Sequence, residues 1–152
     1  MRVVIQRVLQ SRVEVNGVTV GAIDRGLLVY VGVAVGDGPA DAAMLAEKIR
    51  FLRIFEDEQG KMNLDVVQAQ GAVLAVSAFT VQADARKGRR PSFDAAARGD
   101  EARELYERFC ESLEGERLTV ARGEFGAYMQ VHSVNDGPVC ILLDSLQRTP
   151  NS

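Results

Sequence analysis

The chain has 152 residues, of which 47% are hydrophobic and 26% are charged. This length suits one compact domain whose core is large enough to fold without disulfides or structural metal ions. The formal net charge of −3 excludes a general electrostatic attraction between the whole protein and nucleic acid. Any RNA binding therefore needs a local basic patch.

Neither a membrane span nor a secretion signal is expected. The longest nearly apolar run, residues 27–35, has about half the length needed to cross a bilayer as a helix. Residues 1–6, Met-Arg-Val-Val-Ile-Gln, lack the hydrophobic region of a signal peptide. We therefore expect a cytoplasmic protein.

The two cysteines, Cys110 and Cys140, lie in different predicted elements and have no C-x-x-C spacing. This argues against a disulfide scaffold, a zinc ribbon and a redox-active dithiol. We expect both thiols to be reduced and Cys110 to lie in the core.

The first third of the chain predicts β-structure. Residues 3–8 and 12–15 are rich in β-branched side chains, and Asn16-Gly17 between valines is a strong signal for a two-residue hairpin turn. Residues 26–33 are apolar on both faces, which is typical of a central strand covered on each side.

Two segments have helical periodicity. The first opens at Asp37-Gly38-Pro39, with Asp37 or a near neighbour as the cap, and its apolar face consists of Ala42, Leu45, Ile49 and Leu52. The second runs from about residue 100 to residue 113, and its apolar stripe consists of Ala102, Leu105, Tyr106, Phe109 and Leu113.

Further strands are predicted at residues 72–77, 118–120, 128–131 and 139–143. The order of strands, helix, strand, helix and strands indicates a mixed α/β (α+β) protein. We expect a single domain over residues 1–145 and a flexible polar tail over residues 146–152.

Several common chemistries are excluded by the residue types present. His132 is the only histidine, so a multi-histidine metal site is impossible, and the acidic residues are scattered rather than clustered. His132 falls on the same strand face as Gln130, which favours a solvated or structural histidine over a general base. No phosphate-binding or dinucleotide-binding glycine motif occurs. We expect no metal and no cofactor.

Three motifs remain, and each has an ordinary structural interpretation. Asn135-Asp136-Gly137-Pro138-Val139-Cys140 reads as a turn before a strand, and Ser77-Ala78-Phe79-Thr80 reads as a strand end. Arg86-Lys87-Gly88-Arg89-Arg90-Pro91-Ser92-Phe93 reads as a solubilising surface loop.

In combination, these motifs resemble the D-aminoacyl-tRNA deacylases, hydrolases that remove D-amino acids from mischarged tRNA. The resemblance runs from Met1 to about Ser145, and it includes residues 1–8, 52–57, 60–63 and 125–131 in the same order. It implies one domain with largely antiparallel, barrel-like β-sheets flanked by two main helices. It also implies a homodimer that works without a cofactor.

The resemblance implies a chiral filter made by Gly137 and Pro138, whose peptide bond is cis in that family and which enters the pocket of the partner subunit. Arg7 would brace this segment, and Ala78, Met129 and Asn135 would also border the substrate. A backbone filter excludes the L-enantiomer near Cα without reading the side chain, so it admits many D-amino acids and achiral glycine.

Ser77, Phe79 and Thr80 correspond to the catalytic pocket floor of that family. An aminoacyl ester is already activated, so a site that positions water and offers backbone N–H donors to the developing oxyanion can hydrolyse it. Two routes stay open. The ribose 2′-hydroxyl of the tRNA can help to activate the water, or Thr80 can act directly, although nothing in the sequence supplies its base.

The chain departs from the family pattern at two positions. Ala78 stands where the family has Gln, and Cys140 stands where it has Thr, so two hydrogen-bonding side chains are missing beside the site. Cys140 could instead be a reactive thiol, but no matching histidine accompanies it.

Arg86, Lys87, Arg89 and Arg90 are expected to hold the phosphates of a tRNA acceptor end without reading its sequence. Two other functions stay open. One is a nucleic-acid-binding module on the same fold that has lost activity, for which Ala78 is the main motive, and the other is an editing enzyme with relaxed chirality toward L-alanine.

Overall fold

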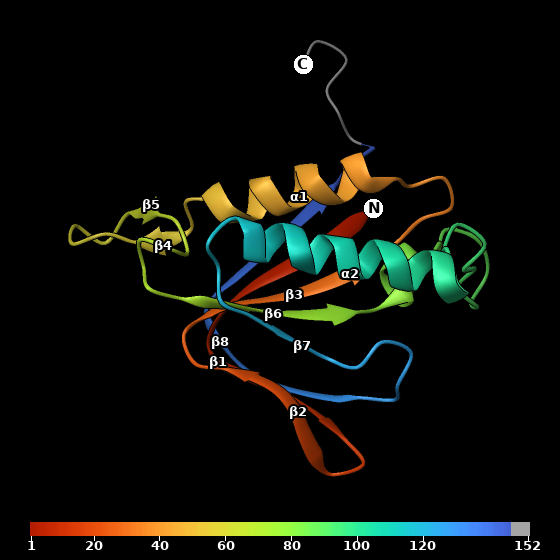
Figure 1. The fold of residues 1–152 in the computed structure, drawn as a ribbon, viewed down its shortest axis with the longest axis horizontal. Coiled ribbons are helices and arrows are strands. Elements are labelled where there is room, and N and C mark those ends of the chain that lie inside the picture. Colours follow the sequence, from red (N-terminus) through yellow and green to blue (C-terminus); the bar gives the residue numbers. More distant parts are fainter. Residues whose placement is uncertain (147–152) are drawn as a thin grey trace.

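The computed structural model of the chain describes residues 1–146, and Figure 1 shows its fold. Its elements, in chain order, are β1 (Arg2–Val15), β2 (Val18–Ile23), β3 (Gly26–Gly32), α1 (Pro39–Phe51), β4 (Phe55–Glu56), β5 (Met62–Leu64), β6 (Ala72–Ser77), η1 (Phe79–Gln82, a 3₁₀ helix), α2 (Gly99–Gly115), β7 (Val120–Arg122) and β8 (Gln130–Asp144). Residues 147–152 of the predicted flexible tail, 146–152, lie outside the described residues.

One mixed sheet organises the molecule. Its strands follow the order β2-β1-β3-β6-β7, and β8 also pairs with β1. The pairs β3–β6 and β6–β7 are parallel, whereas β1 is antiparallel to β2, β3 and β8. The short β4–β5 hairpin lies at one end of the molecule (Figure 1). The prediction of a mixed α/β domain with largely antiparallel pairing is confirmed.

Both long helices cover the same face of this sheet and lie side by side (Figure 1). The main core fills the space between them and the sheet, and it contains the predicted apolar residues of both helices except Leu52, which is the C-cap of α1 and is only partly buried. The predicted stripe of α2 is fully represented: Ala102, Leu105, Tyr106, Phe109 and Leu113 are all buried, and so are Ala42, Leu45 and Ile49 of α1. Burial of these faces is the main source of stability for helices of this length.

A second, smaller core lies on the opposite face of the sheet, where Val8, Val13, Leu28 and Leu74 are buried. Here the sheet curls, and β2 approaches β7 so closely that a Cβ on Gly21 would overlap the Arg122 carbonyl. Because only glycine fits this contact, the curled sheet closes into the barrel-like form that the family resemblance implies.

The β1–β2 hairpin turns at the predicted residues. Asn16 has φ 50° and Gly17 has φ 76°, which is the positive-φ pair that a type I′ turn requires. The central strand was also predicted correctly, since β3 lies between β1 and β6 in the sheet and most of its residues are buried.

The start of α1 lies where the sequence predicts, and its cap is a near neighbour of Asp37 rather than Asp37 itself. The N-cap is Gly38, Pro39 is the first helical residue, and the carboxylate of Asp41 accepts the Gly38 N–H at 2.8 Å. Asp37, predicted as a possible cap, instead accepts the Ala34 N–H and pairs with the α-ammonium of Met1, both at 2.7 Å. Pairing with the buried ammonium stabilises the fold more than a helix cap would, because either charge would otherwise be buried without a partner.

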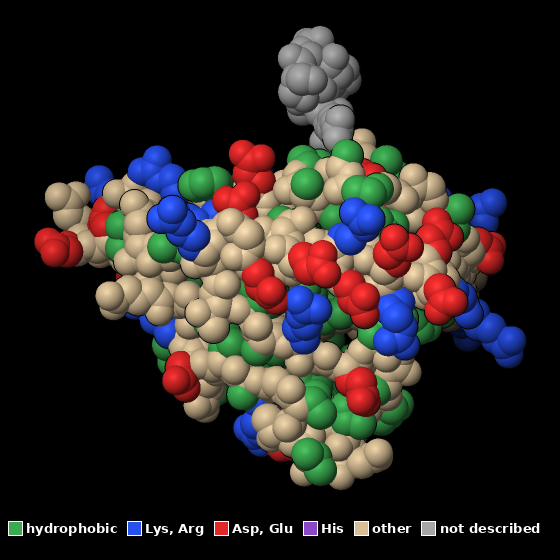
Figure 2. Space-filling model, viewed as in Figure 1, with side chains coloured by type: hydrophobic (Ala, Val, Ile, Leu, Met, Phe, Trp, Pro, Cys, Tyr) green, Lys and Arg blue, Asp and Glu red, His purple; other side chains and the backbone are tan. Residues whose placement is uncertain are grey.

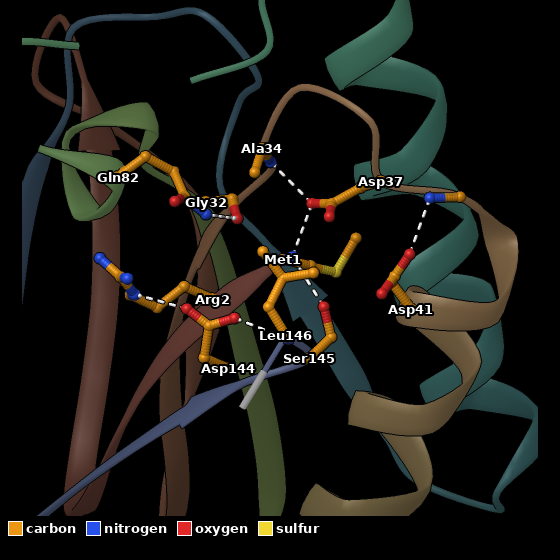
Figure 3. Close-up of polar contacts among 11 residues, drawn as sticks. Met1, Arg2, Gly32, Ala34, Asp37, Asp41, Gln82, Asp144, Ser145 and Leu146 are labelled. Carbon is orange, nitrogen blue, oxygen red and sulfur yellow. Dashed lines mark hydrogen bonds and ion pairs between the residues drawn. The ribbon is translucent and has the colours of Figure 1, made fainter. Parts of the chain in front are cut away.

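Figure 3 shows how this ion pair joins three distant segments. The Met1 ammonium also donates to the Ser145 hydroxyl at 2.8 Å, and the Ser145 N–H donates to the Met1 carbonyl at 2.9 Å. The side chains of Met1 and Asp37 are 0% and 3% exposed. The end of β8 and the β3–α1 loop are thereby held against the start of β1.

The C-terminal strands are longer and fewer than predicted. Residues 130–131 of the first predicted segment and all of the second, 139–143, belong to one strand, β8, which pairs with β1 over nearly its whole length, whereas residues 128–129 precede it. The predicted strand at 118–120 lies instead at 120–122. In the sequence, the Gly-Pro pair indicated a turn between two strands, whereas in the structure it lies in a bulge within one continuous strand.

Cys110 lies in the main core, as predicted, with a side chain that is 0% exposed. Burial raises the pKa of its thiol to about 11, so it stays neutral and unreactive at physiological pH. Among residues 1–146, no helix is both long enough and apolar enough to span a bilayer.

Candidate active site

A cavity of about 580 Å³ opens where β6 ends, beside the N-terminal end of α2. It is bordered by η1 and by the connection between β7 and β8, which runs beneath that end of α2 in Figure 1. Its lining residues include Tyr30, Ser77, Ala78, Phe79, Thr80, Arg98, Phe125, Tyr128 and Met129. The predicted pocket-floor residues therefore all line one cavity.

The chain geometry after β6 explains how these side chains reach the cavity. Four residues of β6 are buried, and the chain then leaves the sheet at Ser77 and enters η1. Ala78 anchors this exit because its N–H donates to the Val31 carbonyl at 2.9 Å and its carbonyl accepts the Val81 N–H at 3.2 Å. The turn presents Ser77 and Thr80 to the cavity from a rigid strand end.

Two backbone donors at this turn have no acceptor. Neither the Phe79 N–H nor the Thr80 N–H donates a hydrogen bond to any of residues 1–146. Both residues line the cavity. Unpaired N–H groups at the head of a helical turn are suited to bind a negatively charged oxygen.

Phe79 is held between two neighbours. Its ring meets Phe93 edge to face with centroids 5.2 Å apart, and the Arg98 guanidinium carbon lies 5.2 Å from the centroid of the same ring. Such contacts fix a ring that is 46% exposed in one orientation at the mouth of the cavity.

The opposite border of the cavity is the loop before β8. Phe125 packs against Tyr106 of α2 with ring centroids 5.8 Å apart, while Tyr128 is 88% exposed. Met129 lines the cavity as the family resemblance implies. Tyr30, on the floor, has a pKa raised by burial, which keeps its hydroxyl protonated and able to donate.

The second predicted group lies on a bulge of β8. Gln6 pairs with Cys140 and Val8 pairs with Asn135, so four residues, 136–139, lie opposite Arg7 alone. The Gly137–Pro138 peptide bond is cis, as the family resemblance implies. Both Gly137 and Pro138 are exposed on the outside of the sheet.

Arg7 braces this bulge, as the resemblance implies. Its guanidinium donates to the Asp136 carbonyl at 3.0 Å and to the Ile54 carbonyl at 2.7 Å, and it lies 3.4 Å from the Asp136 carboxylate. The residue is only 4% exposed. A buried arginine with these partners fixes the bulge relative to the rest of the chain.

Within one chain the structure does not bring the two predicted groups together. Ser77, Ala78, Phe79, Thr80 and Met129 line the cavity, whereas Arg7, Asn135, Gly137 and Pro138 do not. Within the bulge, Gly137 and Pro138 are exposed, whereas Val139 is buried.

His132 takes no part in the cavity. It lies on β8, its Nε2 is 3.4 Å from Glu14 Oε2, and its side chain is 43% exposed. Its surroundings include Arg12, which lowers the pKa of Glu14 through a hydrogen bond. The sequence-based interpretation of His132 as a solvated histidine agrees with this position.

The predicted basic loop follows η1 and is closed by a pair of backbone hydrogen bonds between Asp84 and Ser92, each 2.8 Å long. Among residues 1–146, Lys87, Arg89 and Arg90 have no ion-pair partner. Figure 2 shows Lys and Arg side chains projecting at the right-hand edge of the molecule, where Figure 1 places this loop. These charges are therefore free to meet an anion.

Arg86 differs from the other three cations because its guanidinium donates to both oxygens of Asp84, at 2.9 and 2.8 Å. This hydrogen bonding lowers the pKa of Asp84 to about 2. A depressed carboxyl pKa means that the pair is fully formed above the ordinary pKa of 3.8 and is lost as the pH falls through about 2.

We expect the carboxyl resonance of Asp84 to titrate with a midpoint of about 2 in an NMR pH titration. In Arg86→Ala the midpoint should return toward 3.8, since the main stabilising donor is gone. Lys87→Ala, one residue away, serves as the control and should leave the midpoint unchanged. An unshifted midpoint in the wild type would show that the pair does not form in solution.

Sequence reasoning missed the three other residues of the cavity lining with long polar or charged side chains, Arg98, Tyr30 and Tyr128. Neither Arg98 nor Tyr30 belongs to a motif, and Tyr128 lies within the 125–131 block but was not predicted as a site residue. Tyr30 lies on a strand that reads as uniformly apolar, and Arg98 precedes a helix in which charged residues are common. These three residues are recognised as neighbours only once the fold brings their strand, helix end and loop to the same cavity.

The two departures from the family pattern lie at different places. Ala78 lines the cavity, where its side chain offers no hydrogen bond. Cys140 lies outside it on β8, exposed, with its sulfur 4.0 Å from the Gln6 amide nitrogen. The backbone donors at Phe79 and Thr80 are unaffected by either change.

Comparison with known proteins gives consistent results. The family model described as D-Tyr-tRNA(Tyr) deacylase matches residues 4–144. The chain is 54% identical to a protein named D-aminoacyl-tRNA deacylase from Geobacter sulfurreducens over 152 residues, which cover 100% of both chains. It is 58% identical to a protein of the same name from Koribacter versatilis over 145 residues, covering 95% of this chain and 97% of that one.

Two solved structures share the fold. One, titled c-Myc DNA Unwinding Element Binding Protein, superposes with a TM-score of 0.89 at 40% identity, covering 95% of this chain and 98% of that one. Another, titled as a probable eukaryotic D-amino acid tRNA deacylase, superposes with a TM-score of 0.78 at 18% identity over 93% of this chain and 97% of that one, and shows the shared fold. With a family match over nearly its whole length and relatives above 50% identity, the chain belongs to the D-Tyr-tRNA(Tyr) deacylase family of ester hydrolases.

Proposed function

We propose that this protein hydrolyses the ester bond of D-aminoacyl-tRNA, releasing the free D-amino acid and tRNA. Its family supports the reaction class. The observation that carries the proposal is the cavity in which Ser77 and Thr80 accompany two unpaired backbone N–H groups. We place the reaction in the cytoplasm, where translation makes aminoacyl-tRNA.

In the proposed chemistry, backbone N–H groups stabilise the oxyanion that forms during hydrolysis. Water adds to the ester carbonyl carbon, and the oxyanion that forms is held by the N–H groups of Phe79 and Thr80. The C–O bond to the ribose then breaks, and the ribose oxygen takes up the proton that the water has lost. No histidine or carboxylate among the described residues lines the cavity, which supports activation of the water by the ribose 2′-hydroxyl or by Thr80.

Chiral selection is assigned to Gly137 and Pro138 of a partner subunit. The bulge of β8 lies on the outside of its own chain, and Arg7 holds it in place. Large apolar side chains nearby on β1 and β8 are also exposed, namely Leu9 at 53%, Val134 at 43% and Leu142 at 65%. An exposed apolar surface around a braced protrusion is suited to a homodimer interface.

Such a filter acts at the substrate Cα. A backbone carbonyl placed there leaves room for hydrogen and excludes the side chain of an L-amino acid. Glycine carries only hydrogens at Cα, so we expect glycyl-tRNA to be hydrolysed as well. The cavity offers few polar side chains to read the substrate side chain, which supports a broad range of D-amino acids.

Binding of the tRNA acceptor end is assigned to the basic loop. Lys87, Arg89 and Arg90 are unpaired among residues 1–146, and their loop begins directly after η1, beside the cavity. Phosphate contacts of this kind position RNA without reading its sequence and weaken as salt rises.

One observation favours a second candidate function. The solved structure that is 40% identical to this chain is titled a DNA unwinding element binding protein. Ala78 also removes a side-chain hydrogen bond from the cavity. The alternative is therefore a nucleic-acid-binding module that holds RNA or DNA through the basic loop and does not hydrolyse esters.

The test is deacylation of D-tyrosyl-, L-tyrosyl-, glycyl- and L-alanyl-tRNA by the purified protein. The proposal expects turnover of the D-tyrosyl and glycyl esters and no turnover of either L-ester above the spontaneous rate. Turnover of L-alanyl-tRNA would instead show relaxed chirality. Tight RNA binding with no hydrolysis of any ester would establish the binding module.

A further inference from the structure

We infer that Arg98 binds the last phosphodiester of the tRNA 3′ end and thereby positions the terminal aminoacyl-adenosine in the cavity. This inference rests on the proposed function, which supplies the substrate class. It adds a positioning residue outside the predicted basic loop.

The first support is the charge distribution of the cavity. Among the described residues that line it, Arg98 carries the only charged side chain. The aminoacyl ester and the adenosine are uncharged at their reacting groups, whereas the phosphate that joins the terminal nucleotide to the next one always carries a negative charge. A single cation at the border of an otherwise uncharged cavity matches a substrate whose nearest negative charge is that phosphate.

The second support is that Arg98 has no other task among residues 1–146. It forms no ion pair and no side-chain hydrogen bond, and its one contact is with the face of Phe79. As N-cap of α2 it also makes no side-chain capping bond. An aromatic face restricts the guanidinium plane yet leaves its N–H donors free.

The third support is position. Phe79 is both the ring under Arg98 and a member of the catalytic turn. Phe93, at the end of the basic loop, packs edge to face against the same ring. Arg98 therefore contacts a residue that joins the cavity to the end of the basic loop, a position suited to an RNA strand that runs from the cavity to that loop.

The guanidinium, rather than the helix end, is the binding group. Asp100 and Glu101 lie in the first turn of α2, and their charges counter the attraction of the helix dipole for an anion. Removing the Arg98 charge should therefore remove the phosphate contact.

The experiment compares two D-tyrosyl esters with wild type, Arg98→Gln and Arg98→Lys. One is D-tyrosyl-tRNA, and the other is 2′(3′)-O-D-tyrosyl-adenosine, which has the base and ribose but no phosphodiester. Arg98→Gln should lower kcat/KM for the tRNA ester about tenfold through KM, as expected for loss of one charge-assisted phosphate contact. It should leave the nucleoside ester within about twofold, because that substrate lacks the group that Arg98 binds.

Two further readouts separate phosphate binding from structural support. Arg98→Lys should recover part of the loss, since it keeps the charge without the planar fork. The slope of log kcat/KM against log salt should become shallower by about 0.7 in Arg98→Gln, the value for one contact to a single strand. The matched control is Arg103→Gln, because Arg103 also lies on α2 over an aromatic ring, that of Phe125 at 4.8 Å, but does not line the cavity.

An equal loss on both esters would overturn the inference, because it would show that Arg98 only supports Phe79. No loss on either ester would overturn it as well. Binding of a non-aminoacylated acceptor-stem RNA that ends in single-stranded CCA is measured in parallel. If the wild type hydrolyses no ester, the proposed function fails, while an approximately tenfold weaker RNA affinity in Arg98→Gln still supports the phosphate contact and an unchanged affinity overturns it.

Discussion

Gly137→Ala should lower kcat/KM for D-tyrosyl-tRNA by at least about 100-fold while the protein stays folded. Gly137 has φ +132°, and a Cβ there would lie 2.9 Å from Val139 Cγ2, 3.0 Å from Val139 N and 3.2 Å from Arg7 Nη2. The strain of this backbone conformation amounts to about 1–3 kcal/mol. Because Arg7 holds the bulge, the new methyl group should displace the proposed filter relative to the partner pocket that we propose it enters, and a misplacement of about 1 Å can reduce a rate 100-fold.

Gly17→Ala is the matched control for this substitution. Gly17 also has positive φ, +76°, but a Cβ there meets nothing within 4 Å, and it lies in the β1–β2 turn. It should lose a similar amount of stability and retain full activity. Deacylation rates, chemical denaturation and sedimentation are measured for both variants. Full activity of Gly137→Ala in a folded dimer would contradict the role of the bulge as the chiral filter.

Pro138→Ala probes selectivity in the same bulge. Alanine restores an N–H and relaxes the fixed φ of proline, so the carbonyl groups of the bulge are less tightly held. We expect the ratio of D-tyrosyl- to L-tyrosyl-tRNA hydrolysis to fall.

Asp37→Asn should lower the free energy of unfolding by about 3–5 kcal/mol, the range for breaking a buried ion pair by neutralising one partner. The substitution keeps the shape of the side chain but leaves the Met1 ammonium, which is 0% exposed, without a counter-charge. The Ser145 hydroxyl, at 2.8 Å, remains but carries no charge. Urea denaturation at pH 7 measures the change in midpoint and slope.

Two controls define this result. Asp24→Asn removes an exposed carboxylate that has no partner among residues 1–146, so its effect should stay within about 0.5 kcal/mol. Ser145→Ala removes one hydrogen bond to the ammonium and should cost about 1–3 kcal/mol. A loss below about 1 kcal/mol in Asp37→Asn would show that water or another group compensates the ammonium.

These experiments separate two roles of β8. Its final residues fasten the fold through Ser145 and Met1, whereas the bulge at residues 136–139 faces outward and carries the proposed filter. Asp37→Asn should therefore change stability with little change in D over L selectivity. Gly137→Ala should instead reduce deacylation strongly, with a loss of stability close to that of its control Gly17→Ala.

The sequence by itself determined the local elements and the members of the turn that lines the cavity. Residues 72–77 form β6 as predicted, Asn16-Gly17 forms the hairpin turn, and the buried stripe of α2 is the one its periodicity indicated. These features depend on side chains a few residues apart, so they can be predicted from local sequence without knowledge of the tertiary structure. The motif Ser77-Ala78-Phe79-Thr80 belongs to the same class, because a buried strand and the turn that follows it are adjacent in the chain.

The tertiary structure alone decided which distant residues meet. Arg7 contacts Asp136 across 129 positions, and Met1 contacts Ser145 across 144. Two predicted strands form the single strand β8, because β1 is long enough to pair with both. Asp37, a possible helix cap by sequence, pairs instead with a buried ammonium. The tertiary structure also placed Arg98 at the cavity. No local pattern encodes these choices, since each follows from the burial of charges and backbone groups that become neighbours only when the sheet closes.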